Sequence, residues 1–527
     1  MLTDKKALPI GIQTFAKIRE GHYHYVDKTG YIFELVKEQF IFLSRPRRFG
    51  KSLTLDTIAE LFQANQALFK GLIIYDQWDW SIAYPVIRLS FVIDGIESVE
   101  QLKHGIHLQL QQNAQRLGIG LADEPNVGWL FEALISTVSQ HYQQRVVVLI
   151  DEYDKPILDN LTNPSVARAI RDTLRSFYSV IKAQDRNIHF AMLTGVSKFS
   201  KVNLFSGLNN LLDVTLDSRF SAICGYTQAE LQATFADLLA NVDLNQLKNW
   251  YNGYNWTGER VYNPFDVLLF LTNYRYEAHW FATGSPTFLL DKLWSEAVDI
   301  TQIQNTLTDG ALLSQFDVGD ISPIALLFQT GYLTIEAWHQ LPYGVFYTLK
   351  LPNIEVQQSL NHAILGKYLP LKPSEITQSQ SRLYQSFVHD DIEQLFAVIR
   401  SFFASIPHDW HRNNNIAHFE GYWASVFYAY FASIGLPIRV EDTTSQGRMD
   451  MVVSFANRLY IFEFKVLTKS SDPTPNHQGL QQIKEKNYFA KYQAEFGQIY
   501  LIGVDFFEQE RSVNFAYQQL DDAIADS

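Results

Sequence analysis

The stretch "FLSRPRRFGKSL", Phe42 to Leu53, decides how the first part of the chain folds. The apolar run "QFIFLS" that leads into it has the length of a strand, and "LTLDTIAELFQA" after it has the apolar spacing of a helix. Strand, loop and helix in this order are the context of a phosphate-binding loop, whose N–H groups face a phosphate. We expect Gly50 to form the turn, Lys51 to neutralise phosphate charge and Ser52 to bind magnesium.

The beginning of this stretch departs from the general phosphate loop, G-x-x-x-x-G-K-[ST]. Arg45 stands where the first glycine is expected. Because Arg45 and Pro46 cannot adopt a glycine turn, the loop must approach a phosphate differently. Gly-Lys-Ser alone therefore leaves two interpretations open, a nucleotide site or a basic turn.

A second stretch, "RVVVLIDEYD", favours the nucleotide site. Its apolar run leads directly into two acids, as in a buried parallel strand that delivers carboxylates to the edge of the sheet where ligands bind. We expect Asp151 to hold magnesium through water and Glu152 to polarise the attacking water. A buried strand with a polar exit turn is the alternative. In "IHFAMLTGVSKFS" we expect Thr194 to read the γ-phosphate from a strand between the two motifs.

Near the C-terminus, "GRMDMVVSFANRLYIFEFKVL" predicts a β-hairpin. If two residues form the turn, Phe455 faces Arg458, and the same register places Asp450 opposite Glu463 on one face. Paired carboxylates repel each other unless a cation lies between them. The hairpin therefore predicts a magnesium site.

The side chain of Lys465 falls on the same face as Glu463, because side chains alternate along a strand. Phe462 and Phe464 then point into the core on the other side. A metal at such a site activates water, and the lysine positions the nucleophile or neutralises negative charge. An amphipathic hairpin with ordinary exposed charges is the alternative interpretation.

Composition indicates a folded chain that works without disulfides. Of its 527 residues, 47% are hydrophobic and 19% are charged, so we expect several domains with cores of their own. Cys224 is the one cysteine, which excludes internal disulfides and fits a reducing compartment. The start "MLTDKKALPI" lacks the apolar core of a signal peptide, and no apolar run approaches the ~20 residues that span a bilayer. We expect a cytoplasmic protein that does not enter a membrane.

The middle of the chain carries no recognisable catalytic residues. "SPIALLFQTGYLTI" predicts a helix, a turn and a strand, and "VFYTLKLPNIEV" predicts a strand that leads to a helix cap at Asn353. Together they indicate a winged-helix-like module that binds DNA or packs on its neighbour, and the few basic residues favour packing. "KPSEITQSQS", Lys372 to Ser381, is polar and is expected to be a linker.

Six stretches together resemble the bacterial and archaeal AAA-ATPase-like family, which usually carries a C-terminal PD-(D/E)XK nuclease-like domain. They are "FLSRPRRFGKSL", "VVVLIDEYDKPI", "LTGVSKFSKVNLFSGLNNL", "GYTQAEL", "WYNGYNW" and "VYNPFDVL". Since Arg-Pro-Arg-Arg-Phe-Gly-Lys-Ser is the usual loop of that family, the resemblance implies a nucleotide site of a variant kind. Arg47 or Arg48 then lends positive charge to the phosphates. A solvated or DNA-facing surface remains the other interpretation of both arginines.

The C-terminal part resembles the PD-(D/E)XK core in the order of its elements: a helix with an acid, a strand with aspartate, a strand with Glu-x-Lys and a helix with glutamine. The proline of the family name is replaced by Met449. By this resemblance the active-site positions are Glu420, Asp450, Glu463 and Lys465, and Gln482 supports them.

The expected fold is α/β with three parts. They are an AAA-ATPase-like P-loop NTPase domain with a parallel sheet over residues 1–273, a helical and winged-helix-like region over 274–384, and an α/β restriction-endonuclease-like domain of the PD-(D/E)XK type over 385–527. ATP and Mg²⁺ are the expected cofactors, and Mn²⁺ can replace Mg²⁺ at the nuclease site. The expected partner is nucleic acid, DNA in preference to RNA, and a homo-oligomer is compatible with the pattern.

The resemblance implies ATP-regulated cleavage of phosphodiester bonds in defence or mobile-element biology. The net charge of −13 argues against nonspecific coating of nucleic acid and leaves a local groove open. A signalling switch whose nuclease-like domain only binds nucleic acid or a protein is the alternative. The intact set of Asp450, Glu463 and Lys465 favours the enzyme, because a domain that only binds has no need of all three.

Overall fold

A computed structural model describes residues 6–92, 95–198, 208–279, 289–290, 292–293, 296, 303, 306–368, 373–404, 420–444, 447–467, 478–507 and 512–521. The chain divides into two compact units, Met1–Glu277 with Asn305–Asn353, and Ala278–Gln304 with Ile354–Ser527. The three domains expected from the sequence stay a prediction. Among the described helices, none is both long and apolar enough to cross a bilayer.

The first unit is built on a five-stranded sheet in which every pair of neighbouring strands is parallel, in the order β2-β3-β4-β1-β5. Its strands are β1 (Phe40–Ser44), β2 (Val86–Ser90), β3 (Val146–Asp151), β4 (Ile188–Gly195) and β5 (Leu212–Asp213). Parallel strands are buried on both faces, which is why these segments are almost wholly apolar. The expected α/β class with a parallel sheet is confirmed.

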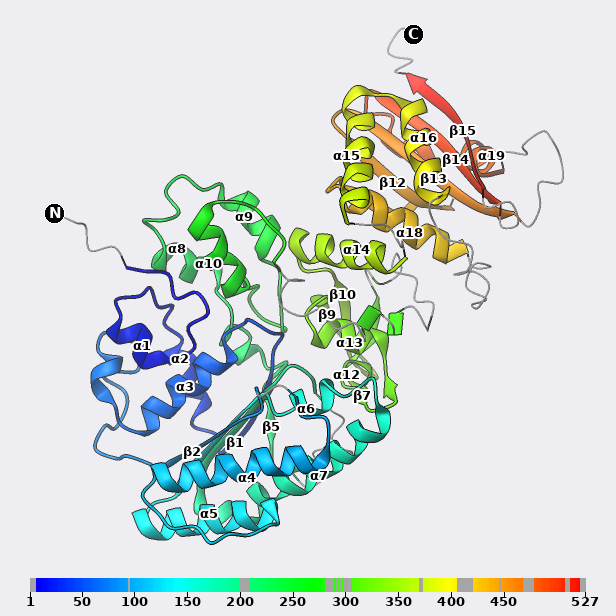
Figure 1. Ribbon diagram of the computed structural model, residues 1–527. Helices are drawn as coiled ribbons and strands as arrows, with labels where there is room; N and C mark the ends of the chain where they lie inside the picture. The colour runs from blue at the N-terminus through cyan, green and yellow to red at the C-terminus, as the bar shows by residue number, and fades with distance from the viewer. Residues whose placement is uncertain are drawn as a thin grey trace. The chain divides into compact units, whose positions relative to one another are not determined.

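Helices cover both faces of this sheet, with α3 on one side and α4, α5 and α7 on the other (Figure 1). The helices of this layer are α1 (Phe15–Glu20), α2 (Thr29–Leu35), α3 (Lys51–Phe62), α4 (Val99–Arg116), α5 (Val127–Tyr142), α6 (Lys155–Leu158) and α7 (Pro164–Ala183). Three further helices share a core with Val26: α8 (Gln228–Thr234), α9 (Leu244–Tyr251) and α10 (Pro264–Asn273).

The first unit also contains a small antiparallel sheet of order β6-β10-β9. It comprises β6 (Leu307–Asp309), β9 (Thr334–Leu341) and β10 (Gly344–Lys350), next to α12 (Gly310–Leu313), α13 (Pro323–Gln329) and the pair β7 (Phe316–Asp317) and β8 (Asp320–Ile321). The expected order of helix, turn and strand is confirmed, with Gly331 at a φ of 87° in the turn. The predicted strand is also confirmed, as β10, and α14 (Ile354–Tyr368) begins directly after Asn353.

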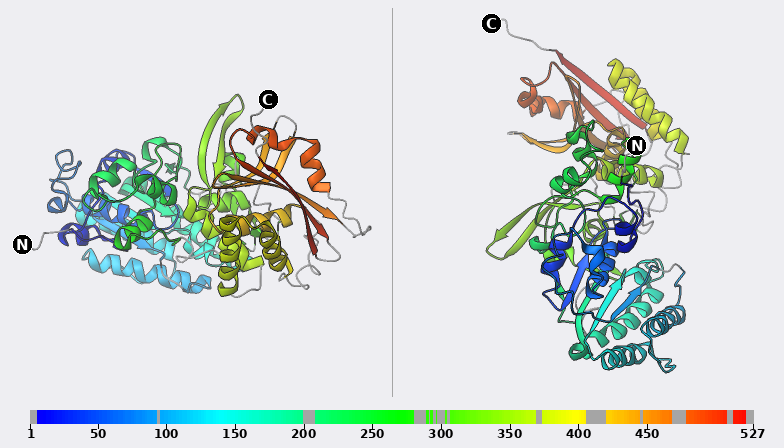
Figure 2. Two further views of the ribbon diagram at one scale, coloured as in Figure 1. Left: turned by 90° about the horizontal axis from the view of Figure 1, so that it is seen from above. Right: turned by 90° about the vertical axis from the view of Figure 1, so that its left-hand side faces the viewer.

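The second unit is built on a mixed sheet of order β11-β12-β13-β14-β15, in which only β13 and β14 run parallel. The strands are β11 (Ile438–Thr444), β12 (Gly447–Phe455), β13 (Arg458–Leu467), β14 (Gln498–Phe507) and β15 (Ser512–Asp521). Helices α16 (Ile392–Ala404) and α18 (Glu420–Ala432) pack on one face, and α19 (Gln478–Glu485) packs on the other (Figure 2).

The linker expected at Lys372 to Ser381 was the wrong interpretation, because residues 373–381 lie in helix α15 (Pro373–His389), while Lys372 lies outside the described residues. Its buried apolar residues Ile376, Leu383 and Phe387 are widely spaced and fall on one helical face. Because the apolar residues of this helix are few and the rest of the segment is polar, the sequence pattern did not indicate a helix.

Candidate functional site

The loop between β1 and α3 has the geometry of a phosphate-binding loop. Gly50 precedes the helix with a φ of 95°, a backbone conformation that favours glycine. Lys51 begins the helix, and its Nζ donates to the carbonyl oxygens of Arg45 and Pro46 at 3.0 Å each. The ammonium therefore lies across the loop at a helix N-terminus, where the helix dipole also favours an anion. Ser52 is the second residue of the helix.

The side chain of Arg45 is fully buried beneath this loop. Its guanidinium donates to the carbonyl oxygens of Ser44 at 2.8 Å, Thr215 at 2.9 Å and Phe220 at 3.1 Å, and it lies 4.2 Å from the ring centre of Trp256. Burial lowers the pKa of Arg45 to about 10. Arg45 thus ties the loop to the segment after β5.

The other two arginines of the loop lie closer to its surface. Arg48 is exposed, has a φ of 68°, and stacks 4.6 Å from the ring centre of Phe265. Arg47 is half-buried. The expected role of both in binding phosphate stays a prediction.

Strand β4 lies between β1 and β3, as expected for a strand between the two motifs. At its end, the Thr194 hydroxyl donates to Asp151 Oδ1 at 2.7 Å. The Glu152 backbone N–H donates to the same oxygen at 3.1 Å, and Glu152 has a φ of 49°, a costly conformation for a side chain of this kind. Because all these strands are parallel, the sheet brings Asp151, Glu152 and Thr194 together at the edge that carries the phosphate loop.

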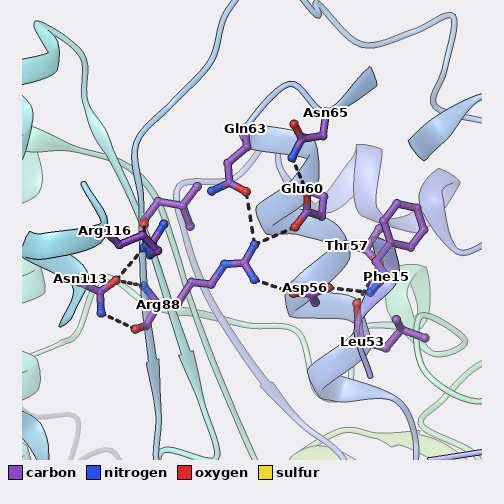
Figure 3. Close-up of polar contacts among 11 residues, drawn as sticks. Phe15, Leu53, Asp56, Thr57, Glu60, Gln63, Asn65, Arg88, Asn113 and Arg116 are labelled. Atoms are coloured by element: carbon purple, nitrogen blue, oxygen red, sulfur yellow. Dashed lines mark hydrogen bonds and ion pairs between the residues drawn. The ribbon is translucent and has the colours of Figure 1, made fainter. Parts of the chain in front are cut away.

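Helix α3 is fixed along its length by a group of charged contacts (Figure 3). Arg88 of β2 pairs with Asp56 at 2.6 Å and with Glu60 at 3.2 Å, both on α3. The other oxygen of Asp56 accepts the backbone N–H of Phe15, the first residue of α1, at 2.6 Å. These partly buried contacts hold the helix that begins at the phosphate loop against both the sheet and α1.

The hairpin of the second unit has the predicted register. Paired residues run from Phe455 opposite Arg458 to Met451 opposite Phe462. Beyond this ladder the carboxylate of Asp450 accepts the backbone N–H of Phe464 at 2.8 Å. The Asp450 carboxylate therefore reaches the strand between the positions of the predicted glutamate and lysine.

Glu463 is 1% exposed, and its Oε1 lies 3.7 Å from Lys465 Nζ. The same oxygen accepts a hydrogen bond from the amide of Gln482 on α19. On the opposite face, Phe462 and Phe464 pack on Phe427 of α18, as expected from alternation. Lys465 and Gln482 thus both approach Glu463 Oε1, on the face of the sheet that α19 covers.

Helix α19 reaches this face because two glycines leave room for it. A Cβ on Gly503 of β14 would lie 2.4 Å from the backbone nitrogen of Leu480, and one on Gly479 would lie 2.7 Å from the carbonyl oxygen of Glu463. Any larger residue would push the helix away and with it Gln482.

Two family models match this chain. Residues 9–205 match the family model described as "Predicted AAA-ATPase", and residues 418–516 match that of the "PD-(D/E)XK nuclease superfamily". An "Uncharacterized protein in vnfD 5'region" from Azotobacter chroococcum mcd 1 is 52% identical over 511 residues, which cover 97% of this chain and 98% of that protein. The chain belongs to the AAA-ATPase-like family with a C-terminal PD-(D/E)XK domain.

Among solved structures, the Aeropyrum pernix Orc1 protein in complex with DNA is similar at 11% identity and a TM-score of 0.26, over 65% of this chain and 94% of that one. A likeness of this size carries no argument about function. The residue ranges matched by the two family models include the phosphate loop, Asp151 and Thr194 in the first, and Asp450, Glu463 and Lys465 in the second.

The donor atoms on the hairpin fit a magnesium ion that substrate helps to hold. The described part of the chain contains no group of three or more His, Cys, Asp or Glu side chains placed to hold a metal. Mg²⁺ is commonly held by one or two carboxylates together with water and substrate phosphates. Asp450 and Glu463 could provide the carboxylates. Glu420 begins α18, but its side chain lies outside the part that the structure describes.

Two buried acids near the sites escaped the sequence-based prediction. Asp154 accepts hydrogen bonds from the Val196 N–H, the Ser197 N–H and the Ser197 hydroxyl, so it joins the turns that follow β3 and β4. Burial raises the pKa of Asp154 to about 6. Asp505 of β14 is 2% exposed and pairs with Lys465 in the parallel ladder. The sequence signal that could have indicated Asp505 is its position as the single acid inside the apolar run "YLIGVDFF".

Proposed function

We propose that this chain binds and hydrolyses ATP and that the nucleotide regulates metal-dependent cleavage of phosphodiester bonds in nucleic acid. The observation that supports the proposal is the presence, in one chain, of a phosphate loop with a lysine across its mouth and of a hairpin in which Asp450 accepts the Phe464 N–H and Glu463 lies 3.7 Å from Lys465. The setting proposed for this activity is defence or mobile-element biology, in the cytoplasm.

At the nucleotide site, Lys51 would exchange its two carbonyl partners for phosphate oxygens, and the first N–H groups of α3 would bind the same phosphate. Ser52 and Asp151 would hold magnesium, and Arg47 and Arg48 would add positive charge. Glu152 would orient the attacking water, and Thr194, already bonded to Asp151, would sense the terminal phosphate.

At the hairpin, Asp450 and Glu463 would hold magnesium, or manganese in its place. When bound, the metal would supply Lewis acidity for water activation. Gln482 would keep the Glu463 carboxylate in position, and Lys465 would neutralise negative charge that develops on the phosphate. Glu420, the first residue of α18, is proposed for this site because of the resemblance to the PD-(D/E)XK core.

One observation favours the alternative, a switch that binds nucleic acid or a protein without cutting. Glu463 is buried, and one of its oxygens already has Gln482 and Lys465 as neighbours. Such contacts also suit a carboxylate that only stabilises the domain. The two functions differ in what the loss of Asp450 does, because a metal ligand is needed for cleavage and not for folding.

The test is digestion of end-labelled DNA and RNA by the full chain with magnesium or manganese, with and without ATP. We expect cleavage that needs the metal, changes with ATP, favours DNA and is lost in Asp450→Ala. Asp390→Ala is a matched control, because Asp390 bonds Tyr460 and Tyr500 rather than this face. No cleavage by the wild type with either metal, together with retained binding of DNA, would favour the switch.

A further inference from the structure

The residues that follow strand β4 are held by contacts from several elements of the first unit. Residues 196–198, here called the β4 exit, come directly after the strand. Ser44, at the end of β1, donates its hydroxyl to the carbonyl oxygen of Val196 at 2.5 Å. Asp154, which follows β3, accepts the N–H of Ser197 at 2.6 Å. These two contacts connect the β4 exit to the neighbouring strands of the parallel sheet.

A further contact comes from the module of residues 306–350, which contains the small antiparallel sheet. Gln329, the last residue of α13, is buried, and its Oε1 accepts the N–H of Lys198 at 2.9 Å. Its Nε2 donates to the carbonyl oxygen of Leu313, at the end of α12, at 2.7 Å. Since an N–H only donates and a carbonyl oxygen only accepts, the two partners fix the orientation of the amide. One buried side chain thus joins the β4 exit to this module.

Other contacts attach the module to the rest of the first unit. Asp317 of β7 pairs with Arg171 of α7 at 2.8 Å. The hydroxyl of Thr334 on β9 accepts the backbone N–H of Asn255 at 2.7 Å. Because these contacts do not involve Gln329, the module stays attached when Gln329 is changed. We therefore expect the contact with Lys198 to act on the β4 exit more than on the attachment of the module.

The β4 exit lies close to a residue of the proposed nucleotide site. Thr194 comes two residues before it, and its hydroxyl donates to Asp151 at 2.7 Å. A shift of the exit is passed to Thr194, because the chain between them is short and its peptide bonds are planar. Groups that act on a reacting phosphate must be held closely, since a misplacement of about 1 Å can lower the rate by ~10²-fold.

We propose that Gln329 is a positioning residue for ATP hydrolysis. By accepting the N–H of Lys198, it keeps the end of β4, and with it Thr194, in place beside Asp151. The module of residues 306–350 then supports the chemistry of the nucleotide site as well as packing on its neighbour. This inference rests on the proposed ATP hydrolysis, and it adds a residue that lies outside the range 9–205 of the matched AAA-ATPase model.

The test compares Gln329→Leu with the wild type in the full chain. Leucine is of similar size and removes both hydrogen bonds of the amide. We expect kcat for ATP to fall roughly 10- to 100-fold while the Kd for ATP changes by less than about 3-fold, because the phosphate loop is untouched. Hydrogen exchange measured by mass spectrometry gives a readout that is independent of activity. Peptides that contain Lys198 should exchange faster in the variant, because this N–H has lost its acceptor.

Two further variants separate positioning from stability. Asp317→Asn is the matched control, because it weakens the pair with Arg171 and leaves the β4 exit untouched, so kcat and the exchange at Lys198 should not change. Gln329→Glu still accepts the Lys198 N–H but places a second acceptor against the carbonyl oxygen of Leu313. It should be no more stable to urea than Gln329→Leu, and yet it should retain more of the wild-type kcat.

Unchanged kcat in a folded Gln329→Leu would overturn the inference. Losses of equal size in ATP affinity and in kcat would also overturn it, because they indicate a general loss of the site's structure. If Gln329→Leu does not fold, Gln329→Met takes its place, since it keeps the length of the side chain and lacks the amide. Absence of ATP hydrolysis in the wild type would instead overturn the proposed function.

Discussion

The hydroxyl of Thr194 donates a hydrogen bond of 2.7 Å to the carboxylate of Asp151, and this bond joins the ends of β4 and β3. Asp154 makes a second connection between the same turns through the Ser197 N–H at 2.6 Å. Two buried or partly buried contacts therefore fix the edge of the sheet at which the phosphate loop also lies. These contacts hold Asp151 and Thr194, the residues proposed to act together on one phosphate, at neighbouring strand ends.

Lys51 and Glu152 should separate nucleotide binding from hydrolysis. Lys51→Ala removes the ammonium that lies across the loop, so we expect loss of ATP binding. Glu152→Gln retains shape but cannot take up a proton, so ATP should still bind while turnover falls by ~10²–10⁴-fold, the usual contribution of a general base. Equilibrium binding and phosphate release are the measurements. Full turnover in Glu152→Gln would remove Glu152 from the chemistry.

Arg45 should contribute more to the stability of the fold than Arg47 and Arg48 do. Arg45→Met leaves three buried carbonyl oxygens without their donor and should lower the free energy of unfolding by about 2–5 kcal/mol. The double variant of Arg47→Ala and Arg48→Ala should change it by less than about 1 kcal/mol, because neither side chain is fully buried. Urea unfolding measures both.

The same double variant tests the charge that the loop offers to phosphate. We expect it to weaken ATP binding more than DNA binding. The opposite result, unchanged affinity for ATP with lost affinity for DNA, would assign Arg47 and Arg48 to a surface that faces nucleic acid.

Asp154 should make stability depend on pH. The pKa is about 6 in the folded chain, against an ordinary value of 3.8, so between these values the folded state keeps a proton that the unfolded state has released. The free energy of unfolding should therefore fall as pH rises through this window, by about 3 kcal/mol in total. In Asp154→Asn this component is absent. Unfolding curves of wild type and variant that stay parallel from about pH 4 to about pH 7 would contradict the assignment.

Local patterns explain what the sequence could predict. The apolar run before Gly50, the run that ends in Asp151 and the alternation around Glu463 each specify an element and a face within about ten residues. The hairpin register followed from the length of its turn, which is why Phe455 and Arg458 were paired correctly.

Long-range contacts explain what could not be predicted. The carbonyl oxygens of Thr215 and Phe220 come from a segment far along the chain, so nothing near Arg45 indicates that its guanidinium is buried. Asp505 comes beside Lys465 only because β14 runs parallel to β13 after a connection of many residues. No local period indicates which parallel strands become neighbours.

The hairpin face offers the sharpest separation of roles. Asp450→Ala should abolish both metal binding and cleavage, because the carboxylate that reaches toward Phe464 is a proposed metal ligand. Lys465→Ala leaves Asp450 and Glu463 in place, so the metal should still bind while cleavage falls by ~10²–10³-fold, the loss typical of one preorganised electrostatic group.

Asp505→Asn supplies the matched comparison for the lysine. It keeps the size of the side chain and removes one negative charge from the strand position beside Lys465. If Asp505 orients the ammonium, cleavage should fall in this variant, and adding Asp505→Asn to Lys465→Ala should cause no further loss, because the two residues then act as one unit. Mn²⁺ titration measures metal binding, and single-turnover assays measure cleavage. Cleavage that persists in Asp450→Ala would show that the chemistry lies elsewhere, and additive losses in the double variant would show that Asp505 acts independently of Lys465.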